Sequence, residues 1–350
     1  MKRQPGMRKV NPAPFSHLTF LSMTLLLVIS LTACARSHWQ TGPVPGSRSL
    51  AIADYPGYLI AKCAWYTDDE ALLALWLLGE ETRLLLARCD MRNGRLREFF
   101  DLPFAVDWED DLLVAPGLLG YQNALNTVTF DRDLTLATTE TSTRDAIRVY
   151  ADDLKWVADI SSDRLVITGA NSPNPLEYQL AANSTLRWSA DGARAACISS
   201  DRTAVHLLDL ESGMHRTLLV GRDIPMPSGF VELMYCRPLP DGKLLLDTAG
   251  EQDAPLIILD IADPGQAHIV PGQGDMTTLA DAGGIALYCL RDRSGGVQRL
   301  LALDCTTRES SLLFETTSEI LCASLSPDGT KVLIGTHSHS TGIYLVVCPR

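Results

Sequence analysis

The chain has 350 residues, of which 46% are hydrophobic, and its 30 Lys and Arg against 42 Asp and Glu give a formal net charge of −12. A chain this acidic, without a patch of interleaved basic and aromatic residues, is a poor match for nucleic acid or an anionic lipid surface. It also lacks a Walker loop and a dinucleotide-binding glycine fingerprint, so we expect no cofactor and no nucleic-acid partner.

The N-terminal segment has a composition of its own. It has four Lys and Arg residues within its first nine positions and no acidic residue before position 34. An apolar run follows over 18–31. That run is too short to span a hydrocarbon core of about 30 Å comfortably, and it suits the hydrophobic part of a signal peptide. It ends in Leu31-Thr32-Ala33-Cys34, which resembles the bacterial lipobox. The resemblance implies a signal peptide over 1–33 and a lipid attached to Cys34, which becomes the new N-terminus.

A lipid on Cys34 would anchor the protein to a membrane, because each buried CH₂ group of the acyl chains contributes about 0.8 kcal/mol. Ala35 follows where many lipoproteins of the inner membrane carry Asp, which favours the outer membrane in a Gram-negative host. Residues 34–48 are rich in Ser, Gly and Pro and predict a flexible tether. An ordinary secretory signal and an uncleaved membrane anchor are the alternatives.

From near residue 60 to the C-terminus a pattern recurs about every 43 residues. A small-Asp-Gly turn leads into an apolar strand, and a second apolar strand then ends in Asp. The turns are clearest at 189–192, 239–242 and 326–329. The residues that end the second strand are Asp90, Asp131, Asp209, Asp260 and Asp304. One further unit, near 178–180, has no such Asp, and the last unit ends near Val347. This period, with four strand-like runs per unit, is typical of a β-propeller. Seven units fit residues 49–350, with six or eight as alternatives.

Each unit reads as four short antiparallel strands, here A to D in chain order. The clearest unit has strands over 185–188, 195–198, 204–208 and 216–220, joined by Asp-Gly and Ser-Gly turns. In the second and third units we expect the A–B turns at 108–111 and 160–163. The chain stops after a C strand over 343–347, so we expect the surplus run at 50–53 to complete the last sheet and close the ring.

The turns Trp188-Ser189-Ala190-Asp191-Gly192 and Leu325-Ser326-Pro327-Asp328-Gly329 resemble the WD40-like "PD40" repeats of the TolB family and of prolyl-oligopeptidase-type propellers. The resemblance covers roughly residues 60–350. There is no room for the α/β domain of TolB, and the chain lacks the Gly-x-Ser-x-Gly elbow of the peptidases. The resemblance therefore implies a single all-β propeller, and it implies fold more than function.

Eight cysteines follow Cys34, and none of them forms a CxxC pair: Cys63, Cys89, Cys197, Cys236, Cys289, Cys305, Cys322 and Cys348. Most lie in apolar strands, which favours buried free thiols that behave as small hydrophobic groups. An exported protein also permits disulfides. One or two such bonds are the alternative, with Cys289–Cys305 as the candidate on neighbouring strands.

The sequence offers few candidates for catalytic or metal-binding residues. His337 and His339 lie two apart in the B–C hairpin of the last unit and could share a metal, as clustered histidines do in lyases with similar propellers. No third ligand can be assigned, and a polar hairpin tip is the alternative reading. We therefore assign no catalytic, cofactor or metal site, and keep His337 and His339 as the candidates for a metal.

Two further groups of residues have a structural and a functional interpretation. The acidic doublets could be acid–base pairs, but we expect solvated turn carboxylates: they are Asp68-Asp69, Asp110-Asp111 and Asp152-Asp153. The tryptophans could form a sugar platform, but we expect them to pack between strands: they are Trp65, Trp76, Trp108, Trp156 and Trp188.

The sequence as a whole predicts a lipid-anchored propeller of the bacterial cell envelope, in the outer membrane and facing the periplasm or the surface if the host is Gram-negative. We expect a non-enzymatic platform for an envelope protein or a peptide, because propellers hold loops on a rigid scaffold. The alternatives are a polysaccharide lyase or hydrolase, and a sensor of a small ligand or sugar that uses the central channel.

Overall fold

The computed structural model of the chain is all-β. Among the residues that the structure describes, the regular elements are the strands β1 to β29 and one 3₁₀ turn, η2 (Pro240–Gly242). The structure describes residues 39–41, 48–51, 58–77, 83–101, 111–115, 118–122, 126–130, 136–141, 147–151, 155–161, 163–169, 174–180, 186–189, 191–226, 230–250, 254–270, 275–282, 284–292, 296–337 and 342–347. Within these ranges no helix has the length and hydropathy needed to cross a bilayer.

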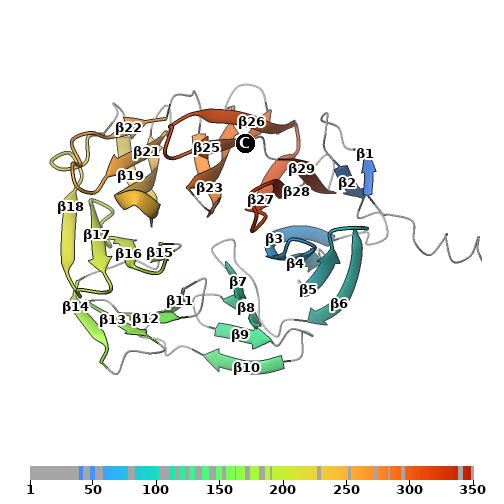
Figure 1. Ribbon diagram of the computed structural model, residues 1–350, viewed down its shortest axis with the longest axis horizontal. Helices are drawn as coiled ribbons and strands as arrows, with labels where there is room; N and C mark the ends of the chain where they lie inside the picture. Colours follow the sequence, from blue (N-terminus) through green and yellow to red (C-terminus); the bar gives the residue numbers. More distant parts are fainter. Residues whose placement is uncertain are drawn as a thin grey trace, which may run out of the picture.

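The strands form antiparallel sheets arranged around a common axis, and we call these sheets blades (Figure 1). Blade one contains β3 (Tyr58–Thr67), β4 (Glu70–Leu77), β5 (Arg83–Asp90) and β6 (Arg95–Asp101). Blade two contains β7 (Asp111–Ala115), β8 (Leu118–Gln122), β9 (Asn126–Phe130) and β10 (Leu136–Thr141). Blade three contains β11 (Ile147–Tyr150), β12 (Trp156–Ile160), β13 (Arg164–Gly169) and β14 (Leu176–Gln179). Blade four contains β15 (Arg187–Trp188), β16 (Arg194–Ile198), β17 (Ala204–Asp209) and β18 (His215–Leu219).

The remaining blades continue the same order. Blade five contains β19 (Phe230–Pro238), β20 (Lys243–Gly250), β21 (Leu256–Asp260) and β22 (His268–Ile269). Blade six contains β23 (Asp275–Ala282), β24 (Ile285–Arg291), β25 (Gln298–Asp304) and β26 (Ser310–Thr316). The last sheet has five strands: β27 (Glu319–Leu325), β28 (Lys331–His337), β29 (Gly342–Val347), β2 (Arg48–Ala51) and β1 (Trp39–Thr41). The expected all-β propeller is confirmed, with A strands near the axis and D strands at the periphery (Figure 1).

The ring closes through a strand from the N-terminal side of the chain. β2 pairs antiparallel with β29, so that Ser49 lies opposite Tyr344 and Leu50 opposite Ile343. The pairing covers the edge that β29 would otherwise leave open, which removes a site for association with other chains. β1 then pairs with β2 and extends the sheet outward. The folded part thus reaches into the stretch over 34–48 for which a tether was expected.

The repeated turn depends on a serine and an aspartate. In the last blade Ser326 Oγ donates to Asp328 Oδ1 (2.6 Å) and accepts from the backbone N–H of Lys331 (2.9 Å), while Asp328 Oδ1 also accepts from the N–H of Thr330 (3.0 Å). Ser189 and Asp191 of blade four make the same bonds. These side chains satisfy backbone groups that a tight hairpin leaves unpaired, which explains why the motif recurs at A–B turns.

The Asp328 turn predicts a dependence of stability on pH. The Ser326 hydroxyl and the backbone N–H of Thr330 lower the pKa of Asp328 from 3.8 to about 2. Since the folded state lowers this pKa, the stabilisation is complete above pH 3.8 and is lost as the pH falls toward 2. We expect Asp328→Asn to lower the melting temperature at neutral pH, by an amount that shrinks over that acid range. Asp263→Asn, at another exposed turn, is the control, and an equal effect of both variants at every pH would contradict this account.

Blades two and three correct two of the expected turn positions. The A–B connection of blade two lies between β7 and β8, and Asp111 begins β7 instead of ending the turn; residues 108–110 lie outside the described residues. In blade three residues 160–163 form the B–C turn between β12 and β13, and the A–B turn comes earlier, after Tyr150. Residues 178–180, expected near the end of a C strand, belong to the D strand β14 and its end.

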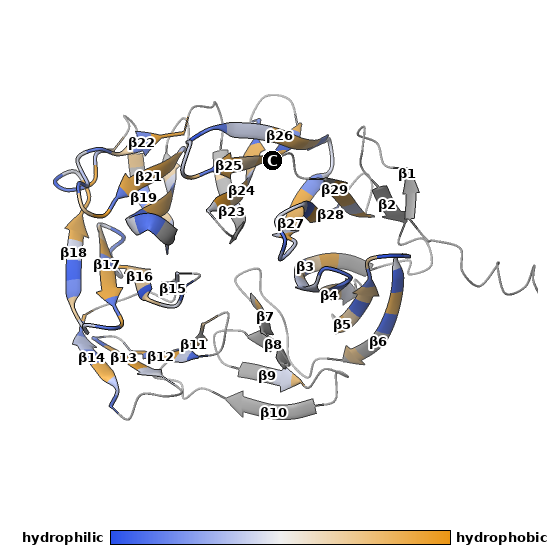
Figure 2. Ribbon diagram, viewed as in Figure 1, coloured by the Kyte–Doolittle hydropathy of each residue, from blue (hydrophilic) through white to orange (hydrophobic). Residues whose placement is uncertain are grey.

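The core lies between neighbouring blades, and residues of the B and C strands make up much of it, together with A-strand residues such as Ile60. Leu72, Leu244 and Leu333 are fully buried in B strands, and burying such a side chain contributes roughly 1.5–3 kcal/mol. The D strands are more exposed: the first two residues of β18 are exposed and only Leu218 is buried, and Figure 2 shows hydrophilic and hydrophobic residues along this strand.

The described cysteines are all free and buried, in agreement with the interpretation as small core residues. They are Cys63, Cys89, Cys197, Cys236, Cys289, Cys305 and Cys322. Burial raises the pKa of Cys89, Cys197 and Cys289 to about 12. The candidate disulfide Cys289–Cys305 is wrong, because Cys289 lies opposite Leu300 whereas Cys305 follows Asp304 at the other end of the hairpin.

Candidate functional site

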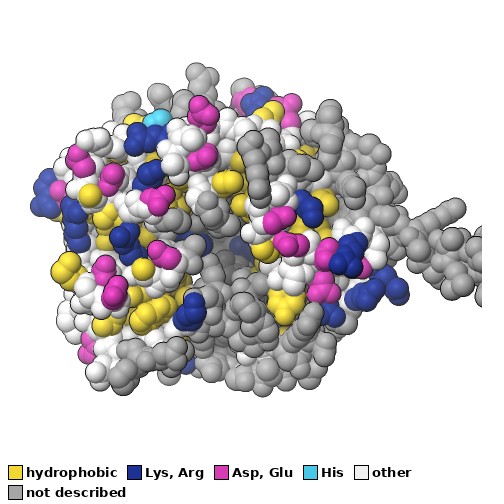
Figure 3. Space-filling model, viewed as in Figure 1, with side chains coloured by type: hydrophobic (Ala, Val, Ile, Leu, Met, Phe, Trp, Pro, Cys, Tyr) yellow, Lys and Arg dark blue, Asp and Glu magenta, His cyan; other side chains and the backbone are white. Residues whose placement is uncertain are grey.

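Several polar side chains that connect neighbouring blades lie at one end of the propeller. All sheets repeat the A-to-D order around one axis, so all B–C connections lie at the same end of the ring. We call this the B–C end. At this end charged residues from different strands meet in pairs. Charged side chains also occur elsewhere on the surface, such as the Arg92–Asp69 pair of blade one, and Figure 3 shows acidic and basic side chains interspersed over the described part of one face.

Blades four and five are joined at the B–C end by an ion pair. Arg202, in the turn between β16 and β17, donates from Nη1 to Glu232 Oε1 of β19 at 2.9 Å. Arg202 adopts a left-handed backbone conformation with φ of 58°, held by the bond from its N–H to the Ser199 carbonyl. The exposed Met234 side chain lies against the same guanidinium, with 3.2 Å between Sδ and Nη1. An arginine, a carboxylate and an apolar group are therefore presented together.

Blades six and seven are joined in a similar way. Arg291, the last residue of β24, donates from Nη2 to Glu319 Oε1, at the start of β27, over 3.0 Å. His337, the last residue of β28, lies directly opposite Glu319 in the strand register. An arginine, a carboxylate and an imidazole thus come from three strands of two blades, and such a set can bind a charged or hydrogen-bonding group.

Two further contacts extend the arrangement around the ring. In blade three Arg148 Nε donates to Asp159 Oδ1 over 2.7 Å across β11 and β12. Between blades five and six the buried Asp247 accepts from the N–H (2.7 Å) and the hydroxyl (2.6 Å) of Thr278. We use the name B–C rim for the three exposed or half-exposed ion pairs with Met234 and His337. The rim comprises Arg148, Asp159, Arg202, Glu232, Met234, Arg291, Glu319 and His337.

The charges of the B–C rim are available to another molecule. The paired side chains are between 36% and 54% exposed, and an ion pair in such a position contributes about 0–1 kcal/mol to stability. The rim side chains can therefore leave these ion pairs and bind groups of another chain with little loss of folding stability. Arg and Met are also enriched in protein interfaces.

The metal candidates are only partly described. His337 lies at the B–C rim as stated, whereas His339 and Cys34 lie outside the described residues. Over the described ranges no three His, Cys, Asp or Glu side chains are grouped so as to hold a metal ion.

The other sequence candidates have structural roles where they are described. Asp69, in the A–B turn of blade one, pairs with the exposed Arg92, as expected of a solvated turn carboxylate. Residues 110 and 152–153 lie outside the described ranges, and Asp111 begins β7. Trp65 and Trp188 are buried between blades, and the indole N–H of Trp65 donates to the Ser324 carbonyl over 3.0 Å. The packing role of these two tryptophans is confirmed.

One group of polar residues in blade four was not predicted from the sequence. His206 of β17 and His215 of β18 are nine residues apart, and the hairpin brings Nδ1 of the first to 3.2 Å from Nε2 of the second. The Glu211-Ser212-Gly213 turn was visible in the sequence and fixes this hairpin. Pairing the two strands across that turn would have placed both imidazoles on one face.

Comparisons with known proteins support the fold. No family model matches the chain, and no curated protein matches it significantly. Among solved structures, it is similar to an oligogalacturonate lyase in complex with manganese, with a TM-score of 0.60 and 11% identity over 89% of this chain and 96% of that one. It is also similar to U3-55K (TM-score 0.57, 10% identity, 88% and 100% coverage) and to the RRP9 WD40 repeats (0.56, 8%, 88% and 99%). These similarities establish a propeller of the WD40 type and, at such identities, the fold alone.

Proposed function

We propose that this chain is a lipid-anchored propeller that binds a protein or peptide segment of the bacterial cell envelope through its B–C rim. The observation that carries the proposal is the set of half-exposed ion pairs at one end of a rigid ring, with Met234 beside Arg202. The lipobox-like segment ending in Cys34 supports membrane attachment. Alternating charge and an exposed apolar contact suit a segment that carries both carboxylates and basic groups.

Charge reversal at the rim tests this proposal. We expect the double variant Arg202→Glu and Arg291→Glu to lose recovery of the partner from gently cross-linked host membranes, because both reversals place like charges beside Glu232 and Glu319. The control is Arg92→Glu, an exposed arginine at the opposite end that also pairs with an aspartate. A Cys34→Ser chain, which cannot be lipidated, should leave the membrane fraction. Equal recovery by the rim variant and the Arg92 variant would contradict binding at the rim.

A second candidate is an enzyme that acts on a polysaccharide. It is favoured by the convergence of Arg291, Glu319 and His337, since lyases and hydrolases need acid–base and charge-stabilising groups on one face. The similarity in fold to an oligogalacturonate lyase makes oligogalacturonides the first substrates to try. Turnover by the purified chain that disappears in His337→Gln would favour this function over the binding platform.

A further inference from the structure

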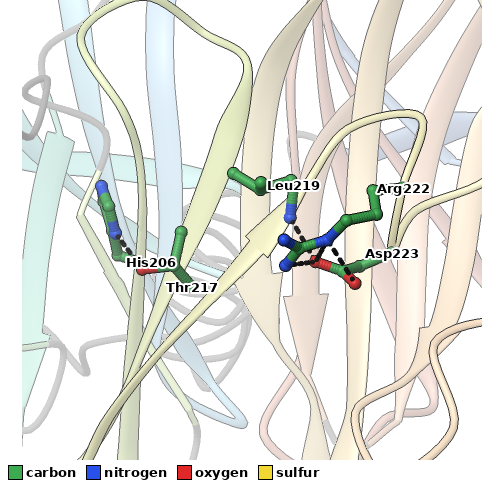
Figure 4. Close-up of polar contacts among 5 residues, drawn as sticks. All are labelled: His206, Thr217, Leu219, Arg222 and Asp223. Carbon is green, nitrogen blue, oxygen red and sulfur yellow. Dashed lines mark hydrogen bonds and ion pairs between the residues drawn. The ribbon is translucent and has the colours of Figure 1, made fainter.

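Blade four carries two imidazoles and a hydroxyl on one face of its outer strands. His206 of β17 lies opposite Thr217 of β18, and Leu208 lies opposite His215. Since side chains two apart on a strand point to the same face, His206, His215 and Thr217 share that face. Figure 4 shows His206 and Thr217 in contact beside the turn that holds Arg222 and Asp223.

The three polar atoms form a nearly equilateral triangle. His206 Nδ1 is 3.1 Å from Thr217 Oγ1 and 3.2 Å from His215 Nε2, and the last two atoms are 3.2 Å apart. Three ligand atoms at this spacing form one face of a tetrahedron whose centre lies about 2.0 Å from each of them, close to the usual Zn–N distance of about 2.0–2.1 Å. We propose that His206 and His215 bind a divalent transition-metal ion of the Zn²⁺ or Cu²⁺ type, with the Thr217 hydroxyl as third ligand or as a hydrogen-bond partner of a bound water.

The chemistry of the ligands fits this class of ion. Imidazole nitrogen is a preferred ligand of Zn²⁺, Cu²⁺ and Ni²⁺, and it binds in its neutral form. Partial burial lowers the pKa of both histidines, and the neighbouring His215 adds to the effect on His206. A lower pKa favours the neutral form of each ring, which is the form that binds metal.

The surroundings close one side of the site and leave the other open. Tyr178 of β14, in blade three, packs edge-on against His215 with ring centroids 6.0 Å apart. Its side chain is 7% exposed, and its hydroxyl has no hydrogen-bond partner among the described residues. His215 itself is exposed, so a metal at this site would keep at least one coordination position for water or for a group of another molecule. The site lies in the outer strands of blade four and is independent of the B–C rim.

Metal titration of the untagged full chain tests the proposal. We expect one equivalent of Zn²⁺ to bind in competition with a chromophoric chelator. With Cu²⁺ we expect an electron paramagnetic resonance spectrum that shows coupling to two nitrogens. Because each variant removes a proposed ligand atom, His206→Gln and His215→Gln should each weaken binding by at least the roughly 10- to 100-fold that loss of an outer-shell partner costs. Because His215 is exposed, we expect the His215→Gln chain to fold as the unchanged chain does, and melting curves without metal check both variants.

Two controls separate this site from other histidines. His268→Gln removes a lone half-buried histidine of the outer strand β22, and the double variant His337→Gln and His339→Gln removes the pair in the last blade. Both should bind Zn²⁺ as the unchanged chain does. A chain that binds neither ion overturns the proposal. So does binding that survives in His206→Gln and His215→Gln but disappears in the His337/His339 variant.

Discussion

Proline at the one of Ser49 and Leu50 whose N–H faces β29 is expected to open the ring. Successive residues of a strand direct their N–H groups toward opposite neighbours, so one of the two prolines removes a bond between β2 and β29 and the other removes a bond between β2 and β1. An unmade ladder bond costs about 1–3 kcal/mol, and the pyrrolidine ring adds a steric cost. The variant that faces β29 should lower the free energy of unfolding more and should expose an edge that promotes aggregation.

Chemical denaturation, with size-exclusion chromatography to detect association, measures this effect. Ser49→Ala and Leu50→Ala keep the backbone N–H groups and serve as controls. If both proline variants unfold at the same denaturant concentration as their alanine controls, β2 does not close the ring.

The second large effect is expected at Gly335, where blades seven and one meet. A Cβ atom at this position would lie 2.7 Å from Cys322 Sγ and 3.0 Å from Ile60 Cγ2, and Ile60 is fully buried. Gly335→Val should therefore lower the free energy of unfolding by about 1–3 kcal/mol or more through overpacking. Gly265→Val is the control, because the nearest atom to a Cβ there is 3.6 Å away in an exposed turn. Equal unfolding free energies for the two variants would show that the seam between the first and last blades is not packed as described.

Much of the fold could be predicted because its turns are local. A serine, an aspartate and a glycine within four residues determine the hairpins at 189–192 and 326–329, and the C strands that end at Asp90, Asp209, Asp260 and Asp304 follow at a regular distance. The closing strand could also be predicted, because an incomplete last sheet and a surplus N-terminal strand require each other.

The error in blade three has a physical cause. Ser199 and Asp201 make the same hydrogen bonds at a B–C turn as Ser189 and Asp191 make at an A–B turn. The Ser-x-Asp motif therefore predicts a hairpin turn, but it does not distinguish an A–B turn from a B–C turn. In blade three this motif lies at the B–C turn, so the expected A–B turn was placed one hairpin too late in the chain.

The candidate site was harder to predict than the fold. Arg202 and Glu232 are 30 residues apart, and Arg291 and Glu319 are 28 apart, in different blades. Their pairing depends on how the blades are placed around the axis, which no local pattern encodes. The His206–His215 contact depends on the register of one hairpin, because the two residues are nine apart in the sequence and share a face only when β17 and β18 pair.

The most direct test of the proposed function is photo-crosslinking from two exposed methionine positions. A photoreactive residue is placed at Met234, on the B–C rim, or at Met214, which is 68% exposed in the C–D hairpin of blade four at the opposite end. After irradiation of cells that produce the full chain, the products are identified by mass spectrometry. The binding-platform account predicts one recurrent adduct from position 234 and none from position 214. Adducts from position 214 alone, or none from either position, would contradict it.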